Sequence, residues 1–290
     1  MKRRIISLIL ALATLLFLCA CTGKNGNSTF SIRFIDVGQG DAALVECDGH
    51  YMLIDGGDTT AGDTVYNVLE ENGIQRLDIL AVSHLHIDHY GGLIKALTYV
   101  SSIGITLSNA DYSDTKAFMD FEHQLHINGS KITIPTPGKT HKSGKTREYE
   151  LGSATVEVID SIAEENNDSL VLLIEYGSTR FLFTGDIENS AQKRISEIYQ
   201  NESDEPFKID LIKMPHHGSY TENLYRFLRT FMPDYAIISC GDENMYGHPD
   251  EKTLKLLNSK TWSSKVYRTD RDGDIIVKSN GKELSVETSK

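Results

Sequence analysis

The stretch Ser83–Gly92 constrains this chain most, because its sequence SHLHIDHYGG places three imidazoles and a carboxylate within six residues, 84–89. The apolar run Leu77–Val82 before it predicts a buried strand, and Leu93–Leu97 after the two glycines predicts the start of a helix. The histidines therefore lie in a strand-to-helix turn, from which side chains can converge on one point. Neutral imidazole and carboxylate are the ligands that suit zinc and related divalent ions.

The first twenty residues differ in character from the rest of the chain. Basic residues 1–4 and the apolar run Ile5–Leu18 predict an export signal over residues 1–20. Leu18-Cys19-Ala20-Cys21 resembles a bacterial lipobox, which implies that Cys21 is lipidated and anchors the chain to a membrane outside the cytoplasm. An ordinary signal peptide or an uncleaved anchor is the alternative. Residues 21–29 are small and polar and predict a flexible tether, and residues 30–290 form the folded domain.

Composition limits what the domain can bind. The chain has 290 residues, 40% of them apolar, which is enough for a full hydrophobic core. Its net charge of −12 disfavours non-specific binding to nucleic acid, although the basic segment from Lys131 to Arg147 is either a solvated loop or a flap for an anionic substrate. Cys47 and Cys240 are far apart in apolar surroundings and are predicted to be free and buried.

Polar residues follow several other predicted strands. Asp186 ends the strand that begins at Arg180, His216 and His217 follow Ile209–Met214, and His248 follows Tyr235–Ser239. Metal-ligand residue types at one edge of successive strands are what a metal site built on a sheet requires. The candidate ligands, about enough for two ions, are His84, His86, Asp88, His89, Asp186, His216 or His217, and His248.

Three further polar residues carry weaker expectations. Asp55 ends a strand before Gly56-Gly57 and is either a turn residue or a group that orients a ligand histidine. His123 and His126 lie on a predicted helix from Asp114 to Leu125, with nothing nearby to complete a metal site. We expect both to be surface residues.

The motif residues also resemble a known family. HLHIDH at 84–89 matches the HxHxDH signature of the metallo-β-lactamase fold, and residues 30 to 280 resemble the hydrolase domain of the competence DNA-uptake channel protein ComEC. Secreted phosphorylcholine esterases of Gram-positive bacteria look similar in the same places. The matching segments are Asp36–Asp41, Leu53–Gly57, Asn167–Leu172, Phe183–Asp186, Lys213–Ser219 and Gly247–Pro249.

The resemblance implies a fold and a division of ligands. The fold is α/β (α+β), a four-layer αβ/βα sandwich in which two mixed sheets are flanked by helices and the site lies at one edge. One metal would be held by His84 and His86 and the other by Asp88 and His89, with Asp186 bridging them. The tRNA 3′-processing nucleases, which look similar in this part, suggest that His248 completes the second metal.

The family's usual third histidine for the first metal has no clear counterpart. His123, His126 and His141 fit this place poorly, and the corresponding strand begins at Asn167-Asp168. His216 is the candidate for the place, or the first metal is weak or absent, and Asp168 is expected to support the site together with Asp55.

The resemblance also implies a reaction. Two divalent cations, Zn²⁺ or else Mn²⁺, would convert a water between them to hydroxide and neutralise charge on a phosphoryl group. Asp88 would orient this water and His217 would contact a phosphate oxygen or protonate the leaving group, while Lys213 adds positive charge or keeps its head in solvent.

The expected function is an extracytoplasmic, lipid-anchored phosphodiesterase that acts on nucleic acid or on an anionic polymer of the cell envelope. Two alternatives stay open. One is a metal-loaded but non-catalytic DNA-capture module of a competence-like system, and the other is an envelope phosphorylcholine esterase.

Overall fold

The computed structural model describes residues 29–136, 148–163, 168–260, 262 and 264–290. Several predicted features lie outside these residues: the signal peptide over residues 1–20, the lipidation site Cys21, the tether up to residue 28, Asn167, and most of the basic segment after Lys131. Among the described residues, no helix has both the length and the apolar character that crossing a membrane requires.

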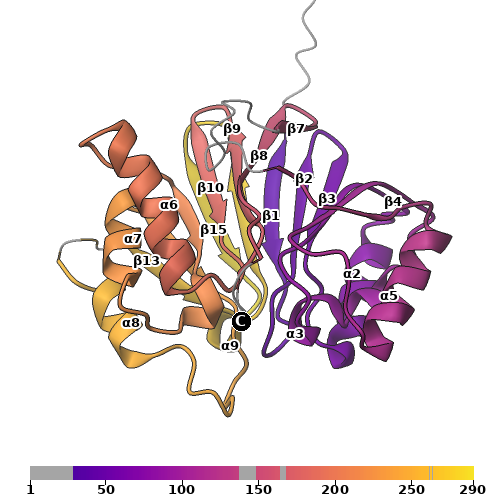
Figure 1. The fold of residues 1–290 in the computed structure, drawn as a ribbon. Helices are drawn as coiled ribbons and strands as arrows, with labels where there is room; N and C mark the ends of the chain where they lie inside the picture. Colours follow the sequence, from indigo (N-terminus) through magenta and orange to yellow (C-terminus); the bar gives the residue numbers. More distant parts are fainter. Residues whose placement is uncertain (1–28, 137–147, 164–167, 261, 263) are drawn as a thin grey trace, which may run out of the picture.

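Two β-sheets face each other at the centre of the molecule (Figure 1). The strands of the first sheet lie in the order β15 (Leu284–Thr288), β14 (Ile275–Ser279), β1 (Phe30–Phe34), β2 (Ala43–Cys47), β3 (His50–Ile54), β4 (Arg76–Val82), β5 (Ser102–Ser108) and β6 (Ile132–Thr133). The strands of the second lie in the order β13 (Lys265–Arg268), β12 (Tyr235–Ile238), β11 (Leu211–Lys213), β10 (Thr179–Phe183), β9 (Val171–Tyr176), β8 (Ala154–Asp160) and β7 (Glu148–Leu151).

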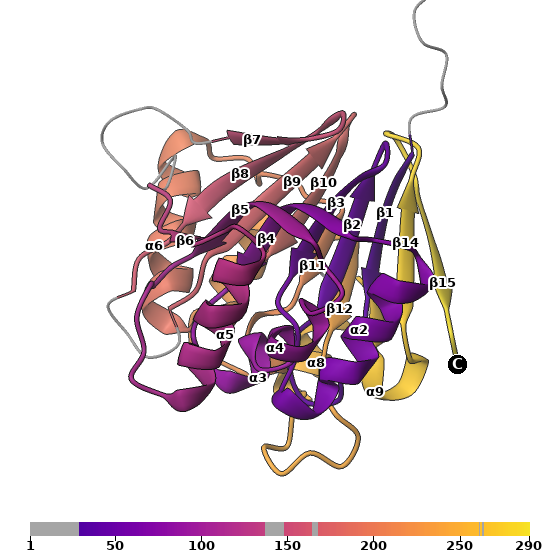
Figure 2. The same cartoon turned by 90° about the vertical axis from the view of Figure 1, so that its right-hand side faces the viewer.

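Helices cover the outer face of each sheet, which gives four layers (Figures 1 and 2). On the first sheet these are α2 (Gly62–Glu71), α4 (Leu93–Ala96) and α5 (Lys116–Ile127), and on the second α6 (Asn189–Glu202), α7 (Leu224–Phe231) and α8 (Glu251–Leu257). Among the described residues, four short helices lie in connections: η1 (Thr59–Ala61), α3 (Ile87–Tyr90), η2 (Pro215–Gly218) and α9 (Thr269–Asp272). The predicted sandwich of two mixed sheets flanked by helices is confirmed.

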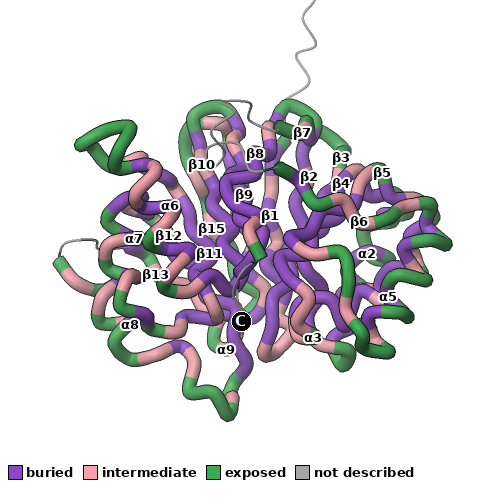
Figure 3. Tube along the Cα trace, viewed as in Figure 1, coloured by how far each residue is buried: buried purple, intermediate pink, exposed green. Residues whose placement is uncertain are grey.

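Apolar side chains fill the three spaces between the layers. Phe30, Ile32 and Phe34 alternate along β1 toward the space between the sheets, where Phe34 stacks on Phe183 with ring centroids 5.7 Å apart. Strand β4 is buried on both faces, as its continuous apolar run predicts, because helices cover its outer side. Figure 3 shows these buried strands between exposed outer helix faces. Each sheet therefore has two apolar faces.

The direction of the strands decides where the polar residues meet. Strands β3, β4 and β5 run parallel in the first sheet, and β10, β11, β12 and β13 run parallel in the second. The carboxyl ends of neighbouring parallel strands lie at one edge of a sheet. The segments after Val82, Phe183, Lys213 and Ile238 therefore all begin at strand ends that can share one side of the sandwich.

The C-terminal strands β14 and β15 extend one edge of the first sheet and do not join the second sheet. β14 pairs antiparallel with β1, so residues from both ends of the described chain lie side by side. The sequence pattern indicated strands here but not this pairing. Cys47 and Cys240 are free and buried, which confirms the expectation that they pack as small apolar residues.

Candidate metal centre

The turn after β4 forms the short helix α3, which carries Asp88 and His89. His86 is the residue before α3, and its carbonyl oxygen accepts a hydrogen bond from the N–H of His89 at 3.0 Å. The carboxylate of Asp55 accepts a hydrogen bond from the N–H of Ser83 at 2.7 Å, which fixes the start of the turn. This geometry buries His89 completely and leaves Asp88 partly exposed.

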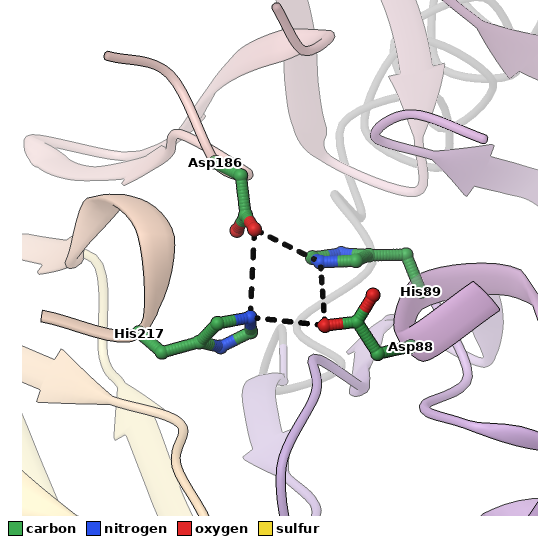
Figure 4. Close-up of side chains that lie close together, drawn as sticks. All are labelled: Asp88, His89, Asp186 and His217. Carbon is green, nitrogen blue, oxygen red and sulfur yellow. Dashed lines mark ion pairs between the residues drawn. The ribbon is translucent and has the colours of Figure 1, made fainter. Parts of the chain in front are cut away.

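Four side chains from both halves of the chain meet in one cluster, Asp88, His89, Asp186 and His217 (Figure 4). The Oδ2 atom of Asp186 lies 3.3 Å from Nε2 of His89 and 3.5 Å from Nε2 of His217. The Oδ2 atom of Asp88 lies 3.4 Å from Nε2 of His217 and 3.8 Å from Nε2 of His89. One ligand atom from each residue lies within 4.8 Å of all the others, which is the spacing of groups around one cation.

The atoms that face the cluster are those that a cation would satisfy. Within the part of the chain that the structure describes, Nε2 of His89 and Nε2 of His217 are buried without a hydrogen-bond partner. Buried polar atoms without partners are costly, and two imidazoles with two carboxylates are a donor set that divalent metals prefer. The residues therefore fit a metal ion.

Both imidazoles are oriented from behind by an oxygen atom. Nδ1 of His89 lies 3.0 Å from Oδ2 of Asp55, and Nδ1 of His217 lies 3.0 Å from the carbonyl oxygen of Ser239. Each Nδ1–H can donate to its oxygen, which leaves Nε2 directed at the cluster. Asp55 thus contacts a histidine of the cluster, one of the two roles considered for it.

The structure places His217 in the cluster and His216 beside it, whereas the sequence assigned a ligand role to His216 and a substrate role to His217. The turn Pro215–Gly218 (η2) holds both histidines at left-handed φ angles, 46° for His216 and 53° for His217. Nδ1 of His216 lies 2.9 Å from Glu188, and its Nε2 lies 3.8 Å from Oδ2 of Asp186. Backbone strain at two adjacent residues is costly and is typical of functional sites.

Asp41 is the site residue that the sequence analysis missed. Its carboxylate forms an ion pair with the buried ammonium group of Lys213, and its Oδ1 lies 3.4 Å from Nδ1 of His217. Its backbone N–H donates to the carbonyl oxygen of Asp88 at 3.3 Å. The close approach requires glycine before it, since a Cβ on Gly40 would lie 2.4 Å from that same oxygen. The sequence signal was the motif Asp36–Asp41, which reads as a tight turn.

Lys213 therefore does not hold its head in solvent. Its side chain is 4% exposed, and Nζ lies 3.9 Å from Oδ1 of Asp186 and 3.4 Å from the carbonyl oxygen of Gly185. Oδ1 of Asp186 faces this ammonium group, while Oδ2 faces the imidazoles. The lysine thus supports the carboxylate that joins the two sides of the site.

The charges of the cluster are strongly coupled. Burial opposes protonation of His89, but the carboxylates of Asp186 and Asp55 outweigh it and raise its pKa to about 10. Burial likewise opposes protonation of His217, and Asp186 and Asp41 raise its pKa well above the ordinary value. Although burial acts to raise it, the pKa of Asp186 is held well below its usual range by His217 and His89. Without a metal, protons on the imidazoles balance the carboxylates.

His84 and His86 form the other part of the site. Nε2 of His84 lies 2.9 Å from Nδ1 of His86, within hydrogen-bond distance, so these two nitrogens lie side by side. Nδ1 of His84 lies 3.2 Å from Oγ of Ser83 and 3.4 Å from Oγ of Ser169. Burial and the neighbouring charge of His89 hold the pKa of His84 well below its ordinary value, which keeps its nitrogen available to a cation.

The remaining predicted residues lie at different distances from the cluster. The ring of His248 lies 5.3 Å from that of His216 and 6.2 Å from that of His217, so it borders the cluster. The carboxylate of Asp168 lies 3.7 Å from the guanidinium group of Arg194 on α6. His123 and His126 are exposed on α5, as expected.

The fold and this site define a class of protein. The chain belongs to the metallo-β-lactamase superfamily, whose family model matches residues 35–242. Its Asp–His cluster is a candidate metal centre of a metal-dependent hydrolase.

Relatives narrow the class to proteins resembling ComEC. The chain is 29% identical to ComE operon protein 3 of Bacillus subtilis over 90% of its own length and 34% of that protein. It is 26% identical to competence protein ComA of Neisseria gonorrhoeae over 83% of its length and 31% of that protein, and 28% identical to recombination protein 2 of Haemophilus influenzae over 86% and 29%. The chain thus spans about a third of each of these relatives.

A solved structure has the same fold at low sequence identity. The metallo-β-lactamase fold protein YhfI of Bacillus subtilis matches 86% of this chain and 100% of its own with a TM-score of 0.56 and 12% identity. This likeness supports the four-layer architecture.

Proposed function

We propose that this chain is a metal-dependent phosphodiesterase that uses two divalent cations, Zn²⁺ or Mn²⁺. The observation that carries the proposal is the position of Asp186. Its Oδ2 atom lies within 4 Å of Nε2 of three histidines, at 3.3 Å from His89, 3.5 Å from His217 and 3.8 Å from His216. This carboxylate oxygen suits a cation ligand, and because the ring of His84 lies 4.1 Å from that of His89, we infer that Asp186 is shared with a second cation held by His84 and His86.

The ligand roles follow from which atoms face one another. We assign Asp88, His89 and His217 to one cation and His84 and His86 to the other, with Asp186 shared. Bound cations of this kind lower the pKa of a water molecule and neutralise charge on phosphoryl oxygens. His217 is therefore a ligand in this proposal rather than the group that contacts phosphate.

The cation ligand Asp88 also acts on the reactants, whereas His216, His248 and Lys213 contribute without binding a cation. Asp88 is partly exposed and faces the cluster, so it can orient the attacking water by accepting its hydrogen bond. His216 and His248 face each other on the solvent side of Asp186 and are assigned to the substrate's leaving group. Lys213 acts only through Asp186 and Asp41, because its ammonium group is buried between them.

The substrate of this proposal is an anionic phosphodiester, in nucleic acid or in a polymer of the cell envelope. Two relatives are named for competence and recombination, which supports nucleic acid. The predicted signal peptide and lipidation at Cys21 complete the proposal of an extracytoplasmic enzyme attached to the membrane by its lipid.

Hydrolysis of bis-p-nitrophenyl phosphate by the purified protein tests the proposed reaction. We expect turnover that depends on added Mn²⁺ or Zn²⁺ and is lost in Asp186→Asn and His86→Ala, while His123→Ala on the surface retains it. Metal binding without turnover of this or any other phosphodiester would contradict the enzyme and favour a non-catalytic capture module. Exclusive turnover of phosphorylcholine esters would instead favour the envelope esterase.

A further inference from the structure

The loop between β12 and α8 exposes two apolar side chains beside the metal centre. Met245 is 91% exposed and Tyr246 is 65% exposed, at the tip of the segment that ends with His248. Large apolar side chains are usually buried, and those held in solvent next to a site are candidates for ligand contact. The tip projects from the end of the sandwich where α3 and α9 lie (Figure 1).

Hydrogen bonds within the loop hold the tip in place. The side-chain amide of Asn244 donates to the carbonyl oxygens of Gly241 at 2.8 Å and His248 at 2.6 Å, and its oxygen accepts from the N–H of His248 at 3.0 Å. The N–H of Gly247 donates to the carbonyl oxygen of Asn244 at 3.3 Å. These bonds tie the residues on both sides of Tyr246 together, so the ring is presented by a braced loop.

A series of aromatic rings leads from the cluster to this tip. The ring of His248 lies 6.2 Å from that of His217 at an angle of 29°. The ring of Tyr246 lies 5.9 Å from that of His248 at an angle of 25°. Each ring is tilted by less than 30° against the next, and the outermost offers a flat, mostly exposed surface that one ring, His248, separates from the cluster histidine His217.

We propose that Tyr246 stacks on a nucleobase of the substrate, next to the phosphodiester held at the metal centre. This inference rests on the proposed phosphodiesterase function and names its substrate as a nucleotidyl ester. Every base has a flat π-face, and bases stack on exposed aromatic side chains in proteins that bind single strands. The neighbouring acidic residues Asp242 and Glu243 are exposed on the same loop, which disfavours a long polyanion and favours a short single-stranded segment.

Choline, the other ligand with affinity for aromatic rings, fits this tip less well. Quaternary ammonium groups are bound by cages in which several rings surround the cation. Tyr246 instead stacks on His248 in a nearly parallel series, which favours continuation of the stack by another flat ring.

Two esters with the same leaving group test the proposal. Thymidine 5′-(p-nitrophenyl phosphate) carries a base, and methyl p-nitrophenyl phosphate does not; water cleaves the P–O bond of each to release p-nitrophenol. We expect the wild-type protein with Mn²⁺ to show a higher kcat/KM for the thymidine ester. Tyr246→Ala should lower this preference roughly tenfold, and Tyr246→Phe should keep it.

A tyrosine elsewhere serves as the matched control. Tyr225 is 45% exposed on α7 and contacts Trp262, and Tyr225→Ala should leave the preference unchanged. An equal loss on both esters in Tyr246→Ala would assign the ring a structural role, and no change would remove it from the substrate. A larger loss on p-nitrophenylphosphorylcholine would identify a cation site instead. Each of these results overturns only the stacking of Tyr246 on a nucleobase. Failure of the wild-type protein to cleave either ester overturns the proposed phosphodiesterase function itself.

Discussion

The turn after β4 carries two pairs of candidate metal ligands in very different surroundings. Asp88 and His89 meet Asp186 and His217 from the other half of the chain, and Asp55 supports His89 from behind. Nε2 of His84 and Nδ1 of His86, on the same turn, lie 2.9 Å apart, and serine hydroxyls lie behind His84. We call the first set the inner site and the pair His84 and His86 the outer site.

The difference between the two sites is one of charge. The inner site combines two imidazoles with two carboxylates, and further carboxylates lie behind both imidazoles. The outer site has two imidazoles and, in our proposal, shares Asp186, and the family's third histidine has no clear counterpart at the sequence position where it is expected. Since anionic ligands and oriented histidines raise the affinity for a divalent cation, the inner site should bind the first ion tightly and the outer site should exchange its ion.

Replacing one histidine in each site gives the largest expected effect. His89→Ala should remove the tightly bound ion and lower kcat roughly 10³-fold or more, because several kcal/mol of charge stabilisation is lost. His86→Ala should retain one tightly bound ion while losing much of the activity. Metal content after dialysis and initial rates measure both effects. Equal loss of metal in the two variants would show that the sites are equivalent.

The buried ion pair behind the inner site gives the next effect. Asp41→Asn and Lys213→Met each leave a buried charge without its partner and should each lower the free energy of unfolding by about 3–5 kcal/mol. The double variant should lose less than the sum, because it buries neither charge. Urea unfolding of the metal-free proteins measures this coupling. Strictly additive losses would mean that the pair does not act as a unit.

The affinity of the inner site for a cation should depend on pH, because binding releases protons from its histidines. Because the folded pKa of His89 is raised from 6.5 to about 10, its protonated form stabilises the metal-free protein fully below pH 6.5, and this contribution disappears as pH rises through about 10. A cation in the inner site must displace this proton and that of His217, so its apparent affinity should rise with pH between 6.5 and 10.

Calorimetry in buffers of different ionisation enthalpy counts these protons. At pH 7 the first ion should release about two protons, one from each inner histidine. The ion bound at His84 should release none from that residue, since the lowered pKa of His84 keeps it neutral. A first ion that binds without proton release would contradict the inner assignment.

The inner site also shows what the sequence could and could not predict. The polar residues at strand ends and the buried β4 follow from local patterns, and the four-layer arrangement follows from the resemblance to the family. Local patterns do not predict whether His216 or His217 points into the cluster. The direction depends on the left-handed φ angles of the turn at Pro215–Gly218. Histidine is found at such angles more often than most residues but rarely, so the sequence does not predict them and tertiary contacts impose them.

The ion pair between Asp41 and Lys213 could not be predicted from local sequence patterns either. Asp41 lies in a glycine-rich turn between β1 and β2, and Lys213 ends a strand of the other sheet. Their pairing follows from the packing of one sheet on the other, which brings the two strand ends together. The pairing of the C-terminal β14 with β1 is likewise a contact between segments far apart in the sequence, which the pattern within either strand does not predict.

The smallest expected effect concerns the hydroxyl that connects the two sites. Oγ of Ser169 accepts a hydrogen bond from the N–H of Asp186 at 2.9 Å and lies 3.4 Å from Nδ1 of His84. Ser169→Ala removes a contact worth about 1 kcal/mol, so kcat/KM and the affinity of the outer ion should fall roughly fivefold while the inner ion stays bound. Ser108 is the matched control, since it is also a buried serine and its Oγ has no hydrogen-bond partner among the described residues. Loss of the inner ion in Ser169→Ala, but not in Ser108→Ala, would mean that this hydroxyl positions Asp186 for both cations, and the two sites would then have to be treated as one.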